Sequence, residues 1–366
     1  MKASKLDEIL KKTEQEIALN HKEVLSLLSI TSQDELNRVT LVARKLRERY
    51  FQNKVFLYGF AYFSTYCRND CTFCLYRKSN KSVPRYRKNC AEIMSTAHGL
   101  VDSGVHLVDL TMGEDPQYHN SKHGFRDLVQ MVRDLKQETS TPIMISPGLI
   151  SPEVLWEFRE AGADWYACYQ ETHNPTLYSR LRIEQSYDER MKSKSAAKEM
   201  GYLIEEGLLA GVGDSTEDIA DSILMMKKMG ADQVRVMTFV PQDNTPLADW
   251  GTNSHFRELL IIAVMRLVMP DRLIPATLDV DGLKGLDKRL NSGANVITSI
   301  IPPSSGMAGV SQSSLDIGDG NRTVEKIIPV LRLNNLEPAT QGEYQTWIKS
   351  RQAFLTNLER EGVKCG

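Results

Sequence analysis

The sequence predicts an α/β protein whose core is a (βα)8 or TIM barrel, preceded by an N-terminal helical extension. From residue 55 onward, short runs rich in β-branched and aromatic residues alternate with longer amphipathic segments. Strands that alternate with helices of this length build parallel sheets, and the eight strand candidates equal the number that closes a TIM barrel. An open doubly wound sheet is the alternative that the same alternation allows.

The first 50 residues precede this alternation and mix charged with apolar residues at helical spacing. Val39, Val42, Leu46 and Tyr50 fall on one helical face at a period of 3.6 residues. The segment lacks the uninterrupted apolar core of a signal peptide. We therefore expect residues 1–50 to form a helical extension.

The barrel is expected over residues 51–302. Between its strand candidates, Ser215 and Asp218 form a capping box at the start of a helix. The strand candidates are residues 55–63, 105–113, 141–148, 164–171, 205–213, 232–240, 273–280 and 295–302. Residues 303–366 are expected to close the barrel, and the Ser/Gly-rich stretch that begins there is expected to loop over one barrel end.

The composition is that of an ordinary globular protein, with 41% hydrophobic and 25% charged residues among 366. A formal net charge of −2 gives no broad positive field for a nucleic-acid partner. No run of roughly 18 apolar residues predicts a membrane span. These observations favour a cytoplasmic protein, a reducing compartment where clustered thiols bind metals or do chemistry more often than they form disulfides.

Three of the six cysteines, Cys67, Cys71 and Cys74, follow the first strand candidate with the spacing C-x3-C-x2-C. In a barrel, the loop after a strand lies on the catalytic face. A zinc site would need a fourth ligand nearby, and neither Cys nor His follows before Cys90. A 4Fe-4S cluster normally takes four thiolates, so three would leave one iron open. Zinc, or a group of packed thiols, is the alternative interpretation.

An open iron can bind the amino and carboxylate groups of S-adenosylmethionine, and electron transfer from the cluster would then break a C–S bond to give a 5′-deoxyadenosyl radical. The loop resembles that of the radical S-adenosylmethionine (SAM) superfamily, in which an aromatic residue precedes the third cysteine. Phe73 has this position here. The resemblance implies that its ring lies near the adenine of the cofactor.

Further segments extend this resemblance over residues 55–300. They are similar to a subfamily that contains biotin synthase, the maturase of iron-only hydrogenase and the methylornithine synthases of the pyrrolysine pathway, and they most resemble the last of these. The segments are "GFAYFSTYCRNDCTFC", "MGEDP", "YQETHNPTLYSRLR", "YDERM", "GLLAGVGDSTEDIADSI" and "FVPQDNTPLAD".

The resemblance implies a set of cofactor-binding residues. Glu114 has the position that binds the amino group of S-adenosylmethionine, Glu171 the position that holds the cofactor from the fourth strand, and Arg190 the position that pairs with its carboxylate. Arg182 and Tyr169 are neighbouring candidates. A zwitterionic sulfonium ligand suits acids and a guanidinium group. Without the resemblance, these residues would be interpreted as solvated surface groups.

Charged residues that interrupt apolar strands indicate where a substrate binds. Arg235 and Asp279 each lie in such a strand, where an unpaired charge is costly. We expect Arg235 to receive an α-carboxylate and Asp279 an amino group; pairing with each other or facing a helix is the alternative. Thr277 shares a strand face with Asp279. Ser146 and Ser305 are weaker candidates.

The remaining cysteines, Cys90, Cys168 and Cys365, form no second group, so the sulfur source of a biotin synthase is missing. The resemblance implies an isomerase that converts L-lysine into 3-methylornithine, supplied with electrons by an unidentified donor. The alternatives are a radical enzyme like the hydrogenase maturase or biotin synthase acting on another small substrate, and a non-catalytic iron–sulfur redox sensor.

Overall fold

The computed structural model describes residues 3–251, 254–302 and 322–360, and it confirms the barrel. Eight parallel strands stand in the order β6-β5-β4-β3-β2-β1-β8-β7. A parallel bridge joins Gln233 of β6 to Leu273, two residues before β7, so the sheet nearly closes into a barrel. The strands are β1 (Lys54–Ser64), β2 (Leu107–Met112), β3 (Ile143–Ser146), β4 (Trp165–Ala167), β5 (Leu203–Ala210), β6 (Gln233–Thr238), β7 (Pro275–Thr277) and β8 (Val296–Ile300).

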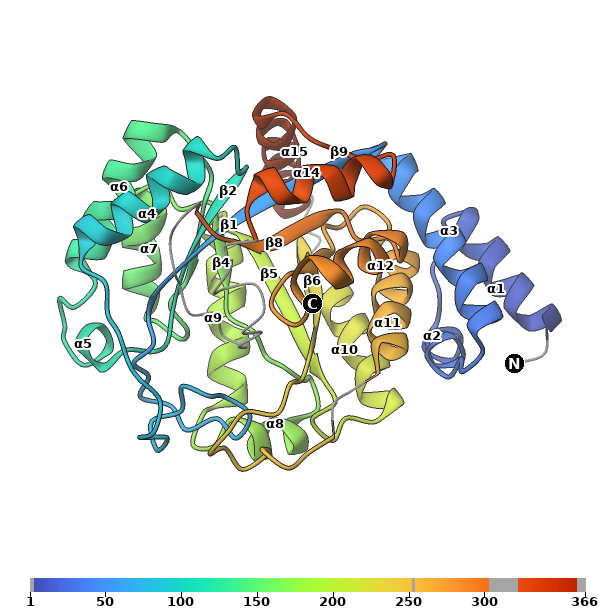
Figure 1. Cartoon of the computed structure of the whole chain (residues 1–366), viewed down its shortest axis with the longest axis horizontal. Helices are drawn as coiled ribbons and strands as arrows, with labels where there is room; N and C mark the ends of the chain where they lie inside the picture. Colours follow the sequence, from blue (N-terminus) through green and yellow to red (C-terminus); the bar gives the residue numbers. More distant parts are fainter. Residues whose placement is uncertain (1–2, 252–253, 303–321, 361–366) are drawn as a thin grey trace.

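Helices surround this sheet, and each of the eight predicted strand segments overlaps a strand (Figure 1). Strands such as β1 and β5 are buried along almost their whole length because the helices cover their outer face. The surrounding helices are α4 (Cys90–Asp102), α5 (Pro116–His119), α6 (Arg126–Thr139), α7 (Pro152–Glu160), α8 (Pro175–Leu181), α9 (Tyr187–Glu199), α10 (Thr216–Lys228), α11 (His255–Val268), η1 (Gly282–Gly285) and α12 (Leu286–Asn291).

The predicted helical extension consists of α1 (Ala3–Glu14), α2 (His21–Leu28) and α3 (Gln33–Phe51). Helices α2 and α3 pack against α10 and α11 on the outside of the barrel. Val39, Val42 and Leu46 are buried as expected, but Tyr50 is exposed. Its hydroxyl donates a hydrogen bond to Glu16 Oε2 at 2.6 Å, so at the end of the helix a surface polar contact replaces core packing.

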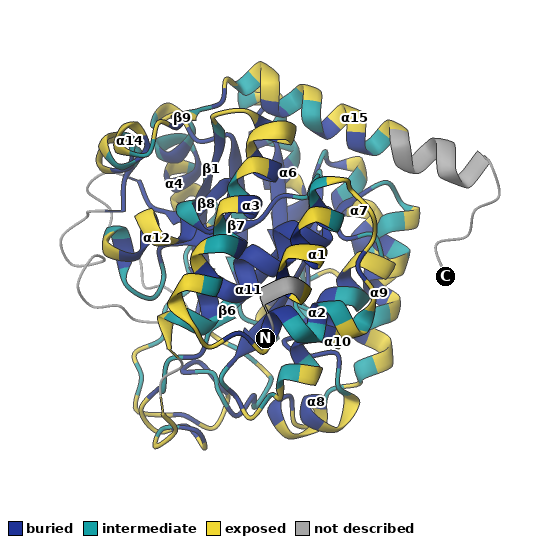
Figure 2. Ribbon diagram, turned by 90° about the vertical axis from the view of Figure 1, so that its right-hand side faces the viewer, coloured by how far each residue is buried: buried dark blue, intermediate teal, exposed yellow. Residues whose placement is uncertain are grey.

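The C-terminal helices α14 (Val324–Leu333) and α15 (Gln341–Arg360) and strand β9 (Glu337–Pro338) lie at the end of the barrel where the strands begin (Figures 1 and 2). Strand β9 pairs with β1. Buried Tyr344 and Ile348 of α15 belong to the same apolar cluster as Tyr58 and Trp165 of the barrel. We propose that this segment closes the barrel there. The predicted Ser/Gly-rich loop, residues 302–320, lies almost wholly outside the described residues.

Replacing Tyr344 with alanine tests this closing role. Tyr344 is fully buried, and its hydroxyl lies 2.6 Å from that of Tyr58. Removing a buried aromatic side chain of this size should lower the free energy of unfolding by about 3–5 kcal/mol. Chemical denaturation measures the loss. The control Tyr50→Ala removes an exposed tyrosine, and equal losses in the two variants would contradict the proposal.

Among the described residues, no helix combines the length and apolar character that crossing a membrane requires.

Candidate functional site

The loop after β1 carries Cys67, Cys71 and Cys74 at the end of the barrel where the strands finish. This is the lower end of the molecule in Figure 1, opposite α15. The N–H of Thr72 donates to the carbonyl of Leu181 at 2.9 Å, which ties the loop to α8. The predicted position on the catalytic face of a barrel is therefore correct.

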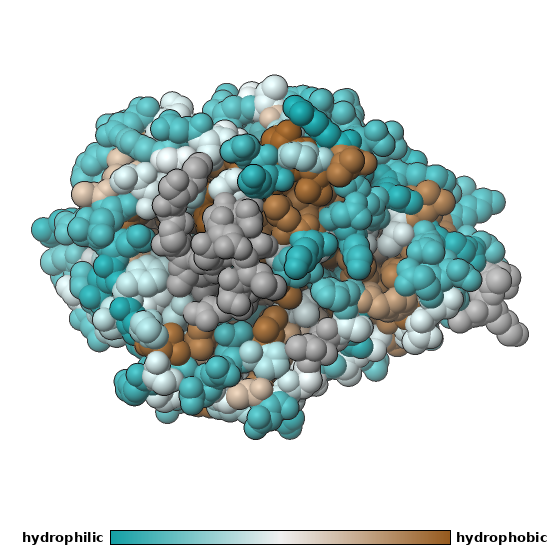
Figure 3. Space-filling model, in the orientation of Figure 1, coloured by the Kyte–Doolittle hydropathy of each residue, from teal (hydrophilic) through white to brown (hydrophobic). Residues whose placement is uncertain are grey.

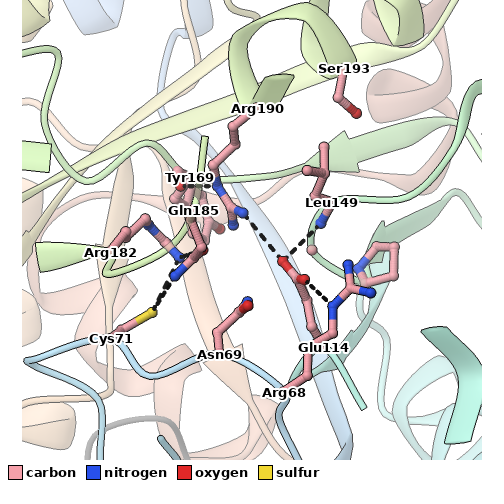
Figure 4. Close-up of polar contacts among 12 residues, drawn as sticks. Arg68, Asn69, Cys71, Glu114, Leu149, Tyr169, Arg182, Gln185, Arg190 and Ser193 are labelled. Carbon is pink, nitrogen blue, oxygen red and sulfur yellow. Dashed lines mark hydrogen bonds and ion pairs between the residues drawn. The ribbon is translucent and has the colours of Figure 1, made fainter. Parts of the chain in front are cut away.

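The pKa values of Cys67 and Cys74 depend on burial and on the neighbouring thiols. Burial, reinforced by the neighbouring thiols, raises the pKa of Cys67 to about 11 and the pKa of Cys74 to about 12. Gln185 Nε2 donates to Cys71 Sγ at 3.1 Å, and Arg182 Nη1 lies 3.6 Å from the same sulfur (Figure 4). Both nitrogen groups therefore point at the sulfur of Cys71.

This donor set fits an iron–sulfur cluster. The three thiols come from one short loop, with no more than three residues between one cysteine and the next. A structural zinc site needs four close ligands, whereas a cluster can be held by the thiolates of a short loop.

Glu114, which follows β2, meets Arg190 of α9 beside this loop. Arg190 Nη1 lies 3.3 Å from Glu114 Oε1, the Leu149 N–H donates to the same oxygen at 3.0 Å, and Arg68 Nε donates to Oε2 at 3.0 Å (Figure 4). Burial alone would raise the pKa of Glu114, but Arg190 and these other donors lower it to about 2. The structure thus brings together an ionised acid and a buried guanidinium group, two predicted cofactor ligands.

Glu171 and Arg182 form a second buried ion pair, 2.6 Å long, and the Arg182 guanidinium lies 5.6 Å from the centre of the Phe73 ring. Burial raises the pKa of Glu171, against the opposing effect of Arg182. Glu171 has a φ of 67°, a left-handed conformation that is costly for a residue other than glycine. The Glu171 carbonyl accepts a hydrogen bond from the Leu209 N–H of β5 at 2.8 Å, and this bond holds Glu171 in the left-handed conformation.

The loop that carries Glu171 is also supported from behind. Glu206 of β5, paired with Lys194, accepts the N–H of Gln170 at 2.8 Å. Both side chains of this pair are fully buried. Tyr169, the other predicted residue of this loop, accepts a hydrogen bond on its carbonyl from Arg190 Nε at 2.9 Å.

A cavity of about 180 Å³ lies at the centre of the barrel, next to the cysteine loop. A single water needs only ~10–15 Å³ in such a measure, so the cavity can hold a small organic molecule. Of the predicted site residues, the cavity wall includes Phe73, Cys74, Ser146, Tyr169, Glu171, Arg235, Thr277 and Asp279. Cys67, Cys71, Glu114, Arg182 and Arg190 lie outside this wall, and Ser305 lies outside the described residues.

Arg235 has an acidic protein partner that the sequence analysis did not consider. Its Nε lies 2.6 Å from Glu205 Oε1 on the neighbouring strand β5, and its guanidinium lies 5.4 Å from the Tyr169 ring centre. The strands β5 and β6 are adjacent in the sheet, so the acid and the base meet across them.

Asp279 is also paired, although not with Arg235. It accepts hydrogen bonds from Thr277 Oγ1 at 2.9 Å and Ser299 Oγ at 2.7 Å, and Arg322 Nη1 donates to it at 3.1 Å. Thr277, predicted as a further substrate contact, thus lies beside Asp279 and bonds to it. Arg322 is buried and comes from the segment just before α14.

Sequence reasoning missed Asp109 and Glu205, which also line the cavity. Asp109 interrupts the apolar strand β2 in the same way that Arg235 interrupts β6, so the same rule could have found it. Ser146 Oγ donates to Asp109 Oδ1 at 2.9 Å, and no ion pair to Asp109 is present among the described residues. Burial, with the neighbouring Glu205, raises the pKa of Asp109 to about 7, while Arg235 opposes the rise.

The charges of the cavity wall and its direct partners leave one negative charge uncompensated. Among the described residues, Arg182, Arg235 and Arg322 balance three of the four carboxylates of the wall, and the fourth, Asp109, remains when it is ionised. Such a wall favours a small ligand that carries groups of both signs and a net charge of +1.

The pKa of Asp109 predicts a pH dependence of stability. Its folded pKa of about 7 lies above the ordinary aspartate value of 3.8, so its contribution to stability is fully present below about pH 4 and is lost as the pH rises through 7. We expect the wild type to lose stability between pH 5 and pH 8 relative to Asp109→Asn, measured by chemical denaturation of the metal-free protein. Asp102→Asn, an exposed substitution, should follow the wild type. Parallel profiles for wild type and Asp109→Asn would contradict the prediction.

Comparison with known proteins gives a consistent result. A family model described as the Radical SAM superfamily matches residues 61–226. The 3-methylornithine synthase of Methanosarcina acetivorans is 44% identical over 349 residues, which are 95% of this chain and 99% of the relative. The FeFe hydrogenase maturase subunit HydE of Thermotoga maritima is 31% identical over 274 residues, 74% of this chain and 77% of the relative. A crystal structure of methylornithine synthase matches with a TM-score of 0.88 and 42% identity, covering 93% of this chain and 99% of the other.

Proposed function

Because this chain belongs to the radical SAM superfamily and, within it, to the methylornithine synthase family, we propose that it isomerises L-lysine to 3-methylornithine in pyrrolysine biosynthesis. It is a radical SAM mutase that uses a 4Fe-4S cluster and S-adenosylmethionine, and its substrate is a small amino acid. It takes electrons from a separate donor and acts in the reducing cytoplasm, where thiols stay free.

The charge of the cavity wall is the observation that carries the choice of lysine. At neutral pH, lysine carries two ammonium groups and one carboxylate, so its net charge is +1. This charge would balance the one negative charge that remains on the cavity wall. In this proposal Arg235 binds the α-carboxylate, Asp279 the α-ammonium and Asp109 the side-chain ammonium. A substrate with a carboxylate and no ammonium group would leave these acids uncompensated, which argues against a reaction like that of biotin synthase.

The cofactor would be held by the residues beside the cysteine loop. Cys67, Cys71 and Cys74 supply the cluster thiolates. Glu114 and Arg190, which now pair with each other, can turn to the amino and carboxylate groups of S-adenosylmethionine. On the cavity side, Phe73 offers a ring for the adenine, while Glu171, Arg182 and Tyr169 support the cofactor from α8 and the loop before it.

When bound, the cluster and S-adenosylmethionine would supply the radical chemistry that removes a hydrogen atom from the lysine side chain. The Cα–Cβ bond then breaks into a glycyl radical and an aminoalkene, which rejoin with branching. Lysine and 3-methylornithine are isomers, so the hydrogen returns to the product without net redox change. Arg235, Asp279 and Asp109 hold both fragments by their charged ends in near-attack geometry, and the closed barrel prevents their escape.

An anaerobic assay tests this proposal. The reconstituted, dithionite-reduced enzyme receives S-adenosylmethionine and 13C-labelled lysine, and the products are separated by chromatography and mass spectrometry. We expect a labelled branched isomer of lysine together with a sub-stoichiometric amount of 5′-deoxyadenosine. Formation of 5′-deoxyadenosine without the branched product would instead favour another substrate, and absence of both would favour a redox sensor.

A further inference from the structure

The segment that follows the third cysteine is strongly basic. Residues 71–91 contain six Lys or Arg residues and no Asp or Glu, whereas the whole chain has a net charge of −2. The six residues are Arg77, Lys78, Lys81, Arg85, Arg87 and Lys88. A local excess of positive charge in a chain of negative net charge indicates a surface that attracts an acidic partner.

This basic segment is attached directly to the cysteine loop. The Lys78 N–H donates to the carbonyl of Asn69 at 2.8 Å, within the loop itself. The Arg85 guanidinium donates to the carbonyls of Thr65 and Tyr76 at 2.6 and 2.8 Å, which fixes the segment against the residues before and after the three thiols. The backbone of the basic segment therefore keeps a fixed position relative to the three thiols.

Part of the basic segment is structural, and part faces solvent. Arg77 pairs with Asp70 at 2.7 Å and Arg87 with Asp115 at 2.6 Å. By contrast, Lys78 and Lys81 are exposed. Among the described residues, the Lys78 ammonium contacts the exposed Glu184 at 3.4 Å, an interaction that contributes little free energy.

The cysteine loop has a cavity side and a solvent side. Phe73 and Cys74 line the cavity, whereas Tyr66 and Arg68, which flank Cys67, are exposed. In Figure 1 the loop and the basic segment lie at the lower left, beside α8, and in Figure 3 mainly hydrophilic residues cover this lower rim. An electron that reaches the cysteine loop from another protein without crossing the substrate cavity must arrive through the solvent side of the loop.

We propose that the exposed lysines of the basic segment, Lys78 and Lys81, dock a small acidic electron-transfer protein of the flavodoxin or ferredoxin class. This inference rests on the proposed function, because only a redox-active cluster needs such a partner. The donor is oxidised by one electron and the cluster is reduced by one, and this electron then cleaves the C–S bond of the sulfonium cofactor. A polyanion such as nucleic acid is disfavoured because the rest of the chain is acidic overall.

A charge-reversal pair tests the docking surface. In Lys78→Glu/Lys81→Glu, reduction of the reconstituted cluster by flavodoxin hydroquinone should be slower by roughly tenfold or more at low salt. The affinity for oxidised flavodoxin, measured by calorimetry, should fall in parallel, and both differences should shrink in high salt because exposed charges are screened. The matched control Lys11→Glu/Lys22→Glu makes the same change of net charge on α1 and α2, far from the loop, and should behave as the wild type.

Reduction by dithionite separates this inference from the proposed function. With dithionite, the Lys78→Glu/Lys81→Glu variant should form 5′-deoxyadenosine at the wild-type rate, because neither lysine contacts the cavity. If flavodoxin reduces and binds this variant as well as it does the control, the docking surface is overturned while the enzyme assignment stands. Loss of binding to a single-stranded oligonucleotide, with flavodoxin reduction unchanged, would likewise overturn it. Absence of 5′-deoxyadenosine from the dithionite-reduced wild type would instead refute the proposed function.

Discussion

Cys71→Ala should contain almost no cluster iron after reconstitution, and its formation of 5′-deoxyadenosine should fall below detection. Cys71 is the most buried thiol of the three and the one that Gln185 and Arg182 contact. With two thiolates remaining, the loop cannot hold a 4Fe-4S cluster with one open iron. Because enzymes of this kind accelerate their reactions by roughly 10⁶-fold or more, loss of the cluster removes essentially all turnover. Iron content, visible absorbance and product formation measure the effect.

The matched control for this prediction is Cys90→Ala. Cys90 is partly buried at the start of α4, outside the cysteine loop. It should keep the iron content and the activity of the wild type. Circular dichroism and thermal unfolding of the metal-free proteins show whether Cys71→Ala still folds. A folded Cys71→Ala protein with a full complement of iron would contradict the assignment of the ligands.

Arg235→Gln should lower kcat/KM for lysine by roughly 30- to 5,000-fold, which corresponds to about 2–5 kcal/mol for removing one partner of a buried charge pair. The loss combines the missing carboxylate contact with an unpaired Glu205. Cleavage of S-adenosylmethionine without lysine should persist, because Arg235 lies on the substrate side of the cavity. The measurements are steady-state kinetics with lysine and the rate of 5′-deoxyadenosine formation in its absence.

The double variant Arg235→Gln/Glu205→Gln separates binding from stability. Removing both members of the pair leaves neither of them as an unpaired buried charge, so the stability lost in Arg235→Gln should largely return. Lysine turnover should stay low because the carboxylate ligand is still missing. Recovery of both stability and turnover would show that Arg235 has only a structural role.

The barrel could be predicted because its signals are local. Strand and helix patterns alternate with clear boundaries, and the capping box of Ser215 and Asp218 forms as expected at the start of α10. The cysteine spacing likewise lies within a single loop. The failure at Tyr50 has a local cause too, since helical periodicity does not show where a neighbouring element ends and solvent begins.

The charge pairs of the cavity could not be predicted because they depend on which strands and segments meet in space. Glu205 meets Arg235 only through the pairing of β5 with β6. Arg322 reaches Asp279 from 43 positions later in the chain. Asp109 was within reach of sequence reasoning, because its charge breaks an apolar strand, but its lack of an ionic partner among the described residues could be seen only in the structure.

The most direct test of the account is magnetic resonance of the reduced, reconstituted enzyme with S-adenosylmethionine labelled with 15N at its amino group. If three thiolates from the cysteine loop leave one iron open, the cofactor binds that iron, the EPR spectrum of the cluster changes, and ENDOR detects coupling to the 15N nucleus. An unchanged spectrum without 15N coupling, or stoichiometric zinc in place of iron in the isolated protein, would contradict it.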